Sequence, residues 1–155
     1  MKQLPADELR AWRAFLYTHA TVIRRLDTEL QAERGLTLSA YEVLLHLRAS
    51  PSRRLRMSEL AGRVMLSPSG CTRVVDQLVK QGLIERRRDS CDARSQLATL
   101  TGKGLEELRA AAPVHVRGIR EHFTGRLDAE QLEAVASGLE AVGAGQTQDE
   151  ALSRS

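Results

Sequence analysis

Mostly hydrophobic side chains near the start of the chain recur at alternating steps of three and four residues, the spacing of one face of an α-helix. The series is Leu9, Trp12, Leu16, His19, Ile23, Leu26 and Leu30. Gly35 follows, and glycine readily adopts the left-handed conformation of a helix C-cap. The pattern predicts a long helix over residues 7–34, whose narrow apolar seam packs against another helix of this chain or of a second subunit.

Capping residues predict the next two helices. Ser39 and Glu42 have the spacing of a capping box, in which each side chain satisfies a backbone N–H at the start of the helix. They predict a helix over residues 40–49, which ends before Pro51 because proline disfavours a helical conformation in the residue before it. Ser58 is the predicted N-cap of a third, short helix.

A fourth helix is predicted between Ser67 and Gly82. Ser67 is a favourable N-cap, Pro68 suits the first helical position, and Gly82 suits the C-cap. The side chains expected on its inward face are Cys71, Val74, Val75, Leu78 and Val79. The third and fourth helices are joined by a tight turn and therefore predict a helix-turn-helix.

Alternation of apolar and polar residues then predicts strands. Residues 83–88 and 95–100 are predicted to pair as a β-hairpin around a turn rich in Asp and Ser. A short extended segment is also predicted at residues 55–57. The first strand of the hairpin is strongly basic, so the hairpin forms a positively charged wing.

Two further helices are predicted after the hairpin. Thr101 caps the first, and Pro113 is expected to kink it. Its expected apolar seam is Leu105, Leu108, Ala112, Val116, Ile119 and Phe123. Asp128 and Gln131 form a capping box at the start of the last helix. The apolar residues expected on that helix are Val135, Leu139 and Val142.

These elements predict a mainly α-helical fold with a small β-hairpin wing. A winged helix-turn-helix over about residues 38–101 is flanked by helices at 7–34 and 102–145. The seams of the flanking helices extend beyond what one small winged domain can cover, so a partner chain is expected to bury them. A single domain is expected over residues 1–145, followed by a flexible tail at 146–155.

Composition narrows the class of protein. Hydrophobic residues make up 42% of the 155 residues and charged residues 28%, as in ordinary globular proteins. Two cysteines are too few for a disulfide framework. Neither a signal peptide nor a membrane-spanning apolar stretch is evident, so a soluble cytoplasmic protein with no membrane partner is expected. The common catalytic motifs do not occur in the sequence, and we expect no enzyme, no metal site and no cofactor.

Positive charge is concentrated in the middle of the chain. The net charge is only +3, but residues 53–94 hold ten Lys and Arg against five Asp and Glu. Of the 23 cationic residues in the chain, 20 are Arg, whose planar guanidinium suits phosphates and guanine edges. Double-stranded DNA is therefore the first expected partner.

The same region carries a set of motifs. They are S-E-L-A-x-x-V-x-L-S-P-S-G-x-T-R-V-V-D-Q-L-x-x-x-G-L-I-E-R from Ser58, D-x-x-D-A-R-S from Asp89 and L-T-G-K-G from Leu100. Over residues 36–105 the sequence resembles the MarR family of bacterial transcription regulators. The resemblance implies a homodimer with interlocked terminal helices and one winged domain per subunit on an inverted-repeat operator.

The helix at residues 68–81 is expected to enter the major groove. There Arg73 can reach guanine or a phosphate, and Gln77 can reach adenine. Hydroxyl groups near the helix N-terminus suit a phosphate. The expected DNA-binding residues, including those of the wing, are Ser67, Ser69, Thr72, Arg73, Gln77, Lys80, Arg86, Arg88, Asp92 and Arg94.

The wing has two interpretations. The arginines at 86–88 suit DNA, but such a run is also typical of a solvated face, and in a strand only alternate side chains share a direction. The resemblance places Arg94 in the adjacent minor groove, with Asp92 bracing the loop, where an arginine reads groove width. Further backbone contacts are expected from Arg53, Arg54 and Arg56.

The resemblance also implies a small effector, often phenolic or anionic, bound between the dimer helices and the winged domain. Trp12, His19, Tyr41 and His46 are the candidate lining residues, Trp12 for stacking and the histidines for contact with an anion. Ordinary core packing explains the same four residues equally well.

Regulation by oxidation or by a metal would use the same architecture. Cys71 fits a small buried hydrophobe, and Cys91 lies between acidic residues that raise the pKa of a thiol. His19, His115 and His122 lie on or beside helix seams without metal-ligand spacing. We expect a repressor released by a small molecule. The alternatives are a redox- or metal-responsive regulator, a transcriptional activator and, last, an interaction module that does not bind DNA.

Overall fold

The computed structural model describes residues 4–89 and 95–153, with the side chains of the last helix described as far as residue 144. The chain divides into two compact units, Met1–Gly118 and Ile119–Ser155. The boundary lies near the end of a helix, so both units contain part of it.

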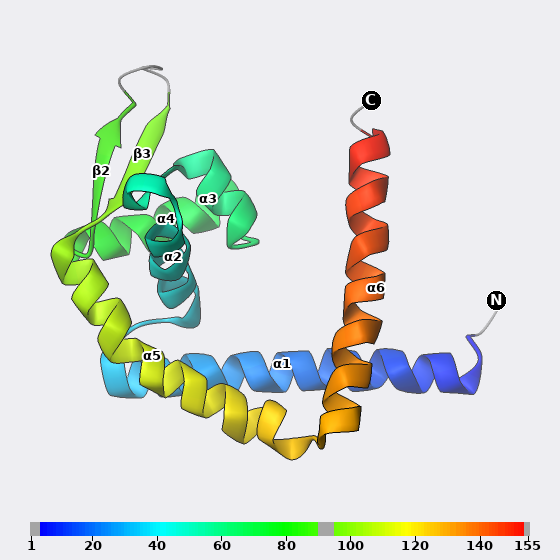
Figure 1. The fold of residues 1–155 in the computed structure, drawn as a ribbon. Coiled ribbons are helices and arrows are strands. Elements are labelled where there is room, and N and C mark those ends of the chain that lie inside the picture. The colour runs from blue at the N-terminus through cyan, green and yellow to red at the C-terminus, as the bar shows by residue number, and fades with distance from the viewer. Residues whose placement is uncertain (1–3, 90–94, 154–155) are drawn as a thin grey trace. The chain divides into compact units, whose positions relative to one another are not determined.

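The first unit is a winged helix-turn-helix with long helices before and after it in the chain (Figure 1). Its elements are α1 (Ala6–Arg34), α2 (Leu38–Ala49), η1 (Pro51–Arg53), β1 (Arg54–Arg56), α3 (Met57–Arg63), α4 (Pro68–Lys80), β2 (Ile84–Arg88), β3 (Gln96–Leu100) and most of α5 (Gly102–His122). This is the predicted fold class, mainly α-helical with a small sheet.

The sheet is antiparallel, with the strand order β1-β3-β2. In the hairpin, Ile84 lies opposite Leu100 and Arg88 lies opposite Gln96. On the other side of β3, Leu55 of β1 lies opposite Ala98. The two predicted hairpin strands are confirmed to within one residue at each end, and β1 joins them as a third strand.

Helix α2 lies at the centre of the core of the first unit. It contacts α1, α3, α4 and β3. The largest fully buried side chains are Leu30, Val43, Leu44, Leu47, Leu60, Cys71, Val75, Leu78, Ile84 and Leu108. Because these side chains come from nearly every element, one continuous core fixes α4 and the sheet relative to each other.

Two predicted helix caps are wrong. Helix α2 begins at Leu38 with Thr37 as its N-cap, whose hydroxyl accepts a hydrogen bond from Ala40 N at 3.1 Å, so Ser39 lies inside the helix. The earlier start is stabilised by Asp27 of α1, which accepts a hydrogen bond from Leu38 N at 2.8 Å. Helix α3 likewise begins before Ser58, at Met57.

Two predicted inward faces are also partly wrong. On α4, Val79 is 37% exposed, although Cys71, Val75 and Leu78 are buried as predicted. On α5, Ala111 and Val114 are buried, whereas Val116 of the predicted seam is exposed. The alanine-rich middle of α5 is compatible with several faces, so local periodicity does not choose among them. The helix continues through Pro113.

The second unit contains the last turn of α5, the 3-10 turn η2 (Thr124–Arg126) and α6 (Ala129–Ser153). The predicted capping box is confirmed: Asp128 Oδ1 accepts from Gln131 N at 2.8 Å, and Gln131 Oε1 accepts from Asp128 N at 3.1 Å. Helix α6 extends to Ser153 and so includes part of the segment 146–155. No helix within the described residues is long and apolar enough to cross a membrane.

Candidate nucleic-acid interface

Helix α4 is held firmly at both ends. Ser67 accepts a hydrogen bond from Gly70 N at 3.1 Å, and Pro68 occupies the first turn, as predicted. At the other end Gly82 has a φ of 74°, and Leu83 N donates to the carbonyl of Leu78 at 2.9 Å. This is a Schellman motif, which ends the helix sharply.

The outer face of α4 carries a polar stripe. Positions 69, 73, 77 and 80 follow the spacing of one helix face, and the side chains there are those of Ser69, Arg73, Gln77 and Lys80. All four are exposed, whereas Cys71, Val75 and Leu78 on the opposite face are buried. The capped helix therefore presents hydroxyl, guanidinium, amide and ammonium groups to the outside.

The N-terminal end of α4 is rich in hydroxyl groups. Ser67 Oγ lies 3.3 Å from Ser69 Oγ, and both residues are exposed. Thr72 is half-buried, and its hydroxyl donates to the carbonyl of Pro68 at 2.9 Å. The three predicted phosphate-binding hydroxyls thus lie within the first turns of α4, and Thr72 is the most enclosed.

Arg86 connects the wing to α4. Its guanidinium pairs with Asp76 of α4 and also donates to the side chain of Gln96 on β3. Arg86 is half-buried, whereas Arg88, two residues further along β2, is exposed. The structure therefore gives Arg86 a bracing contact between helix and wing, while Arg88 lies open to the solvent.

A second ion pair lies at the end of the wing that adjoins its turn. Arg56 Nε donates to Asp89 Oδ2 at 3.0 Å, and Asp89 is only 9% exposed. The backbone N–H of Asp89 also donates to Ser95 O at 2.9 Å, across the ends of the two hairpin strands. Sequence reasoning predicted Arg56 as a DNA contact and missed the role of Asp89, because the pairing depends on how β1 docks beside β3.

The remaining basic residues lie at the surface. Arg53, the last residue of η1, and Arg54, the first residue of β1, are both exposed, and Ser52 and Arg53 have positive φ angles. Arg87 is exposed and pairs with Glu85 on the same face of β2 at 2.9 Å. Cys91, Asp92 and Arg94, in the turn of the wing, lie outside the described residues.

The four candidate effector residues fall into two groups. Trp12 and His19 lie on exposed turns of α1, with Phe15 between them at ring-centroid distances of 6.1 and 6.0 Å. On α2, Tyr41 is buried and His46 is half-buried.

Tyr41 instead pairs with a residue that was not among the candidates. Its ring centroid lies 4.5 Å from that of His115 on α5. Burial raises the pKa of the Tyr41 hydroxyl, and the positive charge of Arg48 opposes this rise. Burial also lowers the pKa of His115, which favours its neutral form.

Cys71 occupies the small buried position that the sequence predicts. It is fully buried on the inner face of α4. Burial raises the pKa of its thiol, and the positive charge of Arg86 partly offsets this rise. A protonated buried thiol is a poor nucleophile, which fits a packing role.

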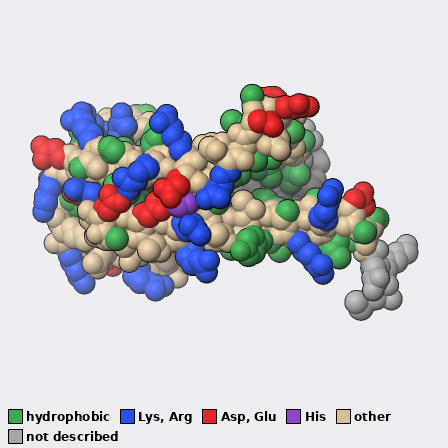
Figure 2. Space-filling model, turned by 90° about the horizontal axis from the view of Figure 1, so that it is seen from below, with side chains coloured by type: hydrophobic (Ala, Val, Ile, Leu, Met, Phe, Trp, Pro, Cys, Tyr) green, Lys and Arg blue, Asp and Glu red, His purple; other side chains and the backbone are tan. Residues whose placement is uncertain are grey.

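Each unit also presents apolar side chains to the outside. On α1, Trp12, Phe15, Leu16 and Ile23 are between 39% and 52% exposed. Figure 2 shows hydrophobic side chains along the N-terminal part of α1. On α6 of the second unit, Leu132, Leu139 and Val142 are exposed. Of these residues, Trp12, Leu16 and Ile23 belong to the predicted seam of α1, and Leu139 and Val142 to the predicted apolar residues of α6. Within the described residues they remain exposed.

Comparisons with known proteins agree on the family. A sequence model described as "MarR family" matches residues 34–95. The crystal structure of Sco3205, a MarR family transcriptional regulator from Streptomyces coelicolor in complex with DNA, has 34% sequence identity and a TM-score of 0.87, covering 94% of this chain and 91% of that chain. AbsC, another MarR family regulator from that organism, has 32% identity and a TM-score of 0.86, covering 96% and 99%.

A curated relative is more distant. The transcriptional repressor MprA of Escherichia coli K12 is 29% identical over 112 residues, which are 72% of this chain and 63% of MprA. The alignment therefore spans less than two thirds of that relative. The matches to the solved structures cover nearly the whole of both chains, and we conclude that the protein belongs to the MarR family of transcription regulators, a family of regulators and not of enzymes.

Proposed function

We propose that the protein is a sequence-specific DNA-binding regulator that acts in the cytoplasm, as a homodimeric repressor on an inverted-repeat operator. The observation that carries the proposal is the polar stripe Ser69, Arg73, Gln77 and Lys80 on a helix that is capped at both ends. A rigid helix of this kind fits the major groove of B-DNA. The DNA in the Sco3205 structure and the description of MprA as a repressor support the same function.

The members of the stripe have different roles in this proposal. The guanidinium of Arg73 binds guanine N7 and O6, and the amide of Gln77 binds adenine. Lys80 and Arg88 bind phosphates, which adds affinity that is independent of sequence and sensitive to salt. The hydroxyls and N–H groups at the start of α4 bind a further phosphate. Asp92 and Arg94 retain their predicted roles at the minor groove.

Dimerisation follows from the uncovered apolar faces. A second copy of the chain is the simplest cover for them, and it would place two winged domains on related half-sites. In this proposal a small aromatic or anionic effector changes the spacing of the two α4 helices and so releases the DNA. Trp12, His19, Tyr41 and His46 stay the candidate contacts. The proposed effector response is tested with a panel of phenolic carboxylates, by measuring shifts in the melting temperature of the protein and the release of bound DNA.

The DNA-binding proposal is tested by fluorescence anisotropy with DNA from the region upstream of the gene and with unrelated DNA, each at two salt concentrations. We expect preferential binding to one upstream segment, weakening as salt increases. Arg73→Ala should weaken specific binding by about 1–3 kcal/mol and relax preference at one base pair. Arg109→Ala, which removes an exposed arginine from α5, is the matched control and should bind like the wild type.

Other outcomes have clear meanings. Equal and weak binding to both DNAs would contradict binding to the upstream region and would direct the search to other genomic sites. Absence of binding to any DNA would overturn the proposal in favour of an interaction module. Transcription from the bound promoter, measured with and without the protein, separates a repressor from an activator.

A further inference from the structure

The segment that joins the wing to α5 makes more contacts than a connecting loop requires. It carries the motif T-G-K-G at residues 101–104, which the DNA-binding proposal leaves without a role. Three successive backbone carbonyls at the end of α4, those of Gln81, Gly82 and Leu83, accept hydrogen bonds from this segment. The start of α5 is therefore attached to the end of the helix that carries the polar stripe.

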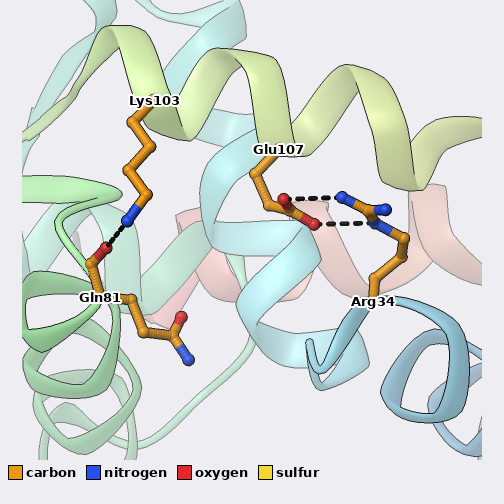
Figure 3. A network of polar contacts seen from close by, with 4 residues as sticks. All are labelled: Arg34, Gln81, Lys103 and Glu107. Atoms are coloured by element: carbon orange, nitrogen blue, oxygen red, sulfur yellow. Dashed lines mark hydrogen bonds and ion pairs between the residues drawn. The ribbon is translucent and has the colours of Figure 1, made fainter.

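Thr101 and Lys103 supply these hydrogen bonds. Lys103 Nζ donates to Gln81 O at 2.7 Å (Figure 3), and a Cβ at Gly82 would lie 3.9 Å from its Cδ. The Thr101 hydroxyl donates to Gly82 O at 2.8 Å, and Thr101 N donates to Leu83 O at 3.1 Å. The ammonium group also lies where the negative end of the α4 dipole favours a cation.

Gly104 brings the two segments into close approach. A Cβ at this position would lie 2.1 Å from Leu83 O and 2.8 Å from Leu100 Cδ1. Only glycine fits such a separation without displacing the backbone. The contact between α5 and the end of α4 is therefore tight as well as hydrogen-bonded.

One turn further along, α5 is attached to α1. Arg34, the last residue of α1, donates from Nε and Nη2 to the two carboxylate oxygens of Glu107 at 2.9 and 2.8 Å (Figure 3). Bidentate pairs of this kind fix orientation as well as distance. Arg117 pairs with Glu33 of α1 as a second tie. The first turns of α5 thus form a strut between α1 and the C-terminal end of α4.

We propose that Lys103 is a positioning residue for DNA binding, and that it acts in a strut, formed by Thr101, Lys103, Gly104 and Glu107, that sets the orientation of α4 relative to α1. The inference rests on the proposed DNA-binding function, since α4 is its recognition helix. Because α1 carries the apolar face that a second subunit would cover, this orientation fixes the placement of each polar stripe on its half-site. Lys103 touches no base in this proposal.

The test uses Lys103→Met, which keeps much of the apolar stem and removes the ammonium group. We expect roughly tenfold weaker binding to the specific upstream segment, the loss associated with a hydrogen bond to a charged group. Affinity for unrelated DNA and the slope of log K against log salt should stay as in the wild type. Lys103→Arg should restore most of the affinity, and Arg109→Met on the same helix is the matched control.

These readouts separate the alternatives. If Lys103 contacts a phosphate directly, the salt slope falls by about 0.9 and binding to both DNAs weakens, which overturns the proposal. If Lys103 only stabilises the fold, the melting temperature falls and the binding loss disappears under conditions where the variant is fully folded. Unchanged specific affinity in Lys103→Met also overturns it. Failure of the wild type to bind specifically would instead contradict the proposed function.

A double-mutant cycle tests the link to α1. Arg34→Met and Glu107→Gln should each weaken specific binding. Because both substitutions break the same Arg34–Glu107 ion pair, the double variant should bind no more weakly than the more affected single variant. Hydrogen exchange at the amides of Gly82 and Leu83, measured without DNA, should speed up in Lys103→Met. Additive losses in the cycle, or unchanged exchange, would contradict transmission through the strut.

Discussion

Asp89, at the end of β2, accepts a hydrogen bond from Arg56 of β1 at 3.0 Å while its own N–H binds Ser95 O. The carboxylate is almost completely buried, although its partner arginine is 45% exposed. The pair joins the two edge strands of the sheet, which lie on opposite sides of β3. It therefore holds β1 to the turn end of the wing independently of any DNA.

Asp89→Ala is expected to destabilise the protein by about 1–3 kcal/mol, because Arg56 loses the acceptor that holds it at the sheet. Urea unfolding followed by circular dichroism measures this loss. Glu85→Ala is the control: the Glu85–Arg87 pair is exposed, and its loss should cost less than about 1 kcal/mol. Equal effects of the two substitutions would contradict a structural role for Asp89.

Gly104→Ala is expected to destabilise the protein by about 1–3 kcal/mol, because the added methyl group overlaps the backbone oxygen of Leu83. Thermal unfolding provides the measurement. Gly102→Ala, where a Cβ meets nothing within 4 Å, should change stability by less than about 0.5 kcal/mol. If Gly104→Ala left the stability of the protein unchanged, α5 would be able to move away from the end of α4 at little cost in free energy.

Stability should depend on pH through His115. Burial lowers its pKa from the ordinary 6.5, so between the folded and unfolded values the unfolded chain binds a proton that the folded chain does not. Its neutral ring therefore contributes fully above about pH 6.5, and this contribution is lost as the pH falls through the lowered folded pKa.

The measurement is the free energy of unfolding between pH 5 and 8 for the wild type and for His115→Gln. Glutamine does not titrate, so the free energy of unfolding of the variant should depend less on pH between pH 5 and 8. Glu42 also has a raised pKa, through burial, but it titrates in both proteins and cancels in the comparison. If the free energy of unfolding changed with pH in the same way in both proteins, the lowered pKa of His115 would be contradicted.

The apolar face of α1 should control the oligomeric state. Leu16→Glu places a charge in that face, where a second subunit would have to bury it, and should shift a dimer toward monomer. Tyr17→Glu is the matched control, since Tyr17 is 75% exposed and lies outside the apolar seam. Sedimentation equilibrium at several concentrations distinguishes the two variants. A wild-type monomer at micromolar concentration would contradict the dimer proposal.

Most elements of the fold, and the exposed stripe of α4, could be predicted from local sequence. The Gly35 C-cap, the Ser67–Pro68 start of α4 and the Asp128–Gln131 capping box all appear in the structure. Each involves groups within a few positions of one another, so the residue types alone determine the contact.

Tertiary packing decided the rest. Thr37 replaces Ser39 as a cap because Asp27, eleven residues before Leu38, satisfies the first N–H of α2. Arg86, expected at DNA, pairs with Asp76 because the wing docks beside α4. Lys103 donates to the carbonyl of Gln81 at the end of α4, and the neighbouring Gly104 permits the close approach of the two segments. Such partners lie far apart in the chain, and spacing within a single helix or strand carries no information about them.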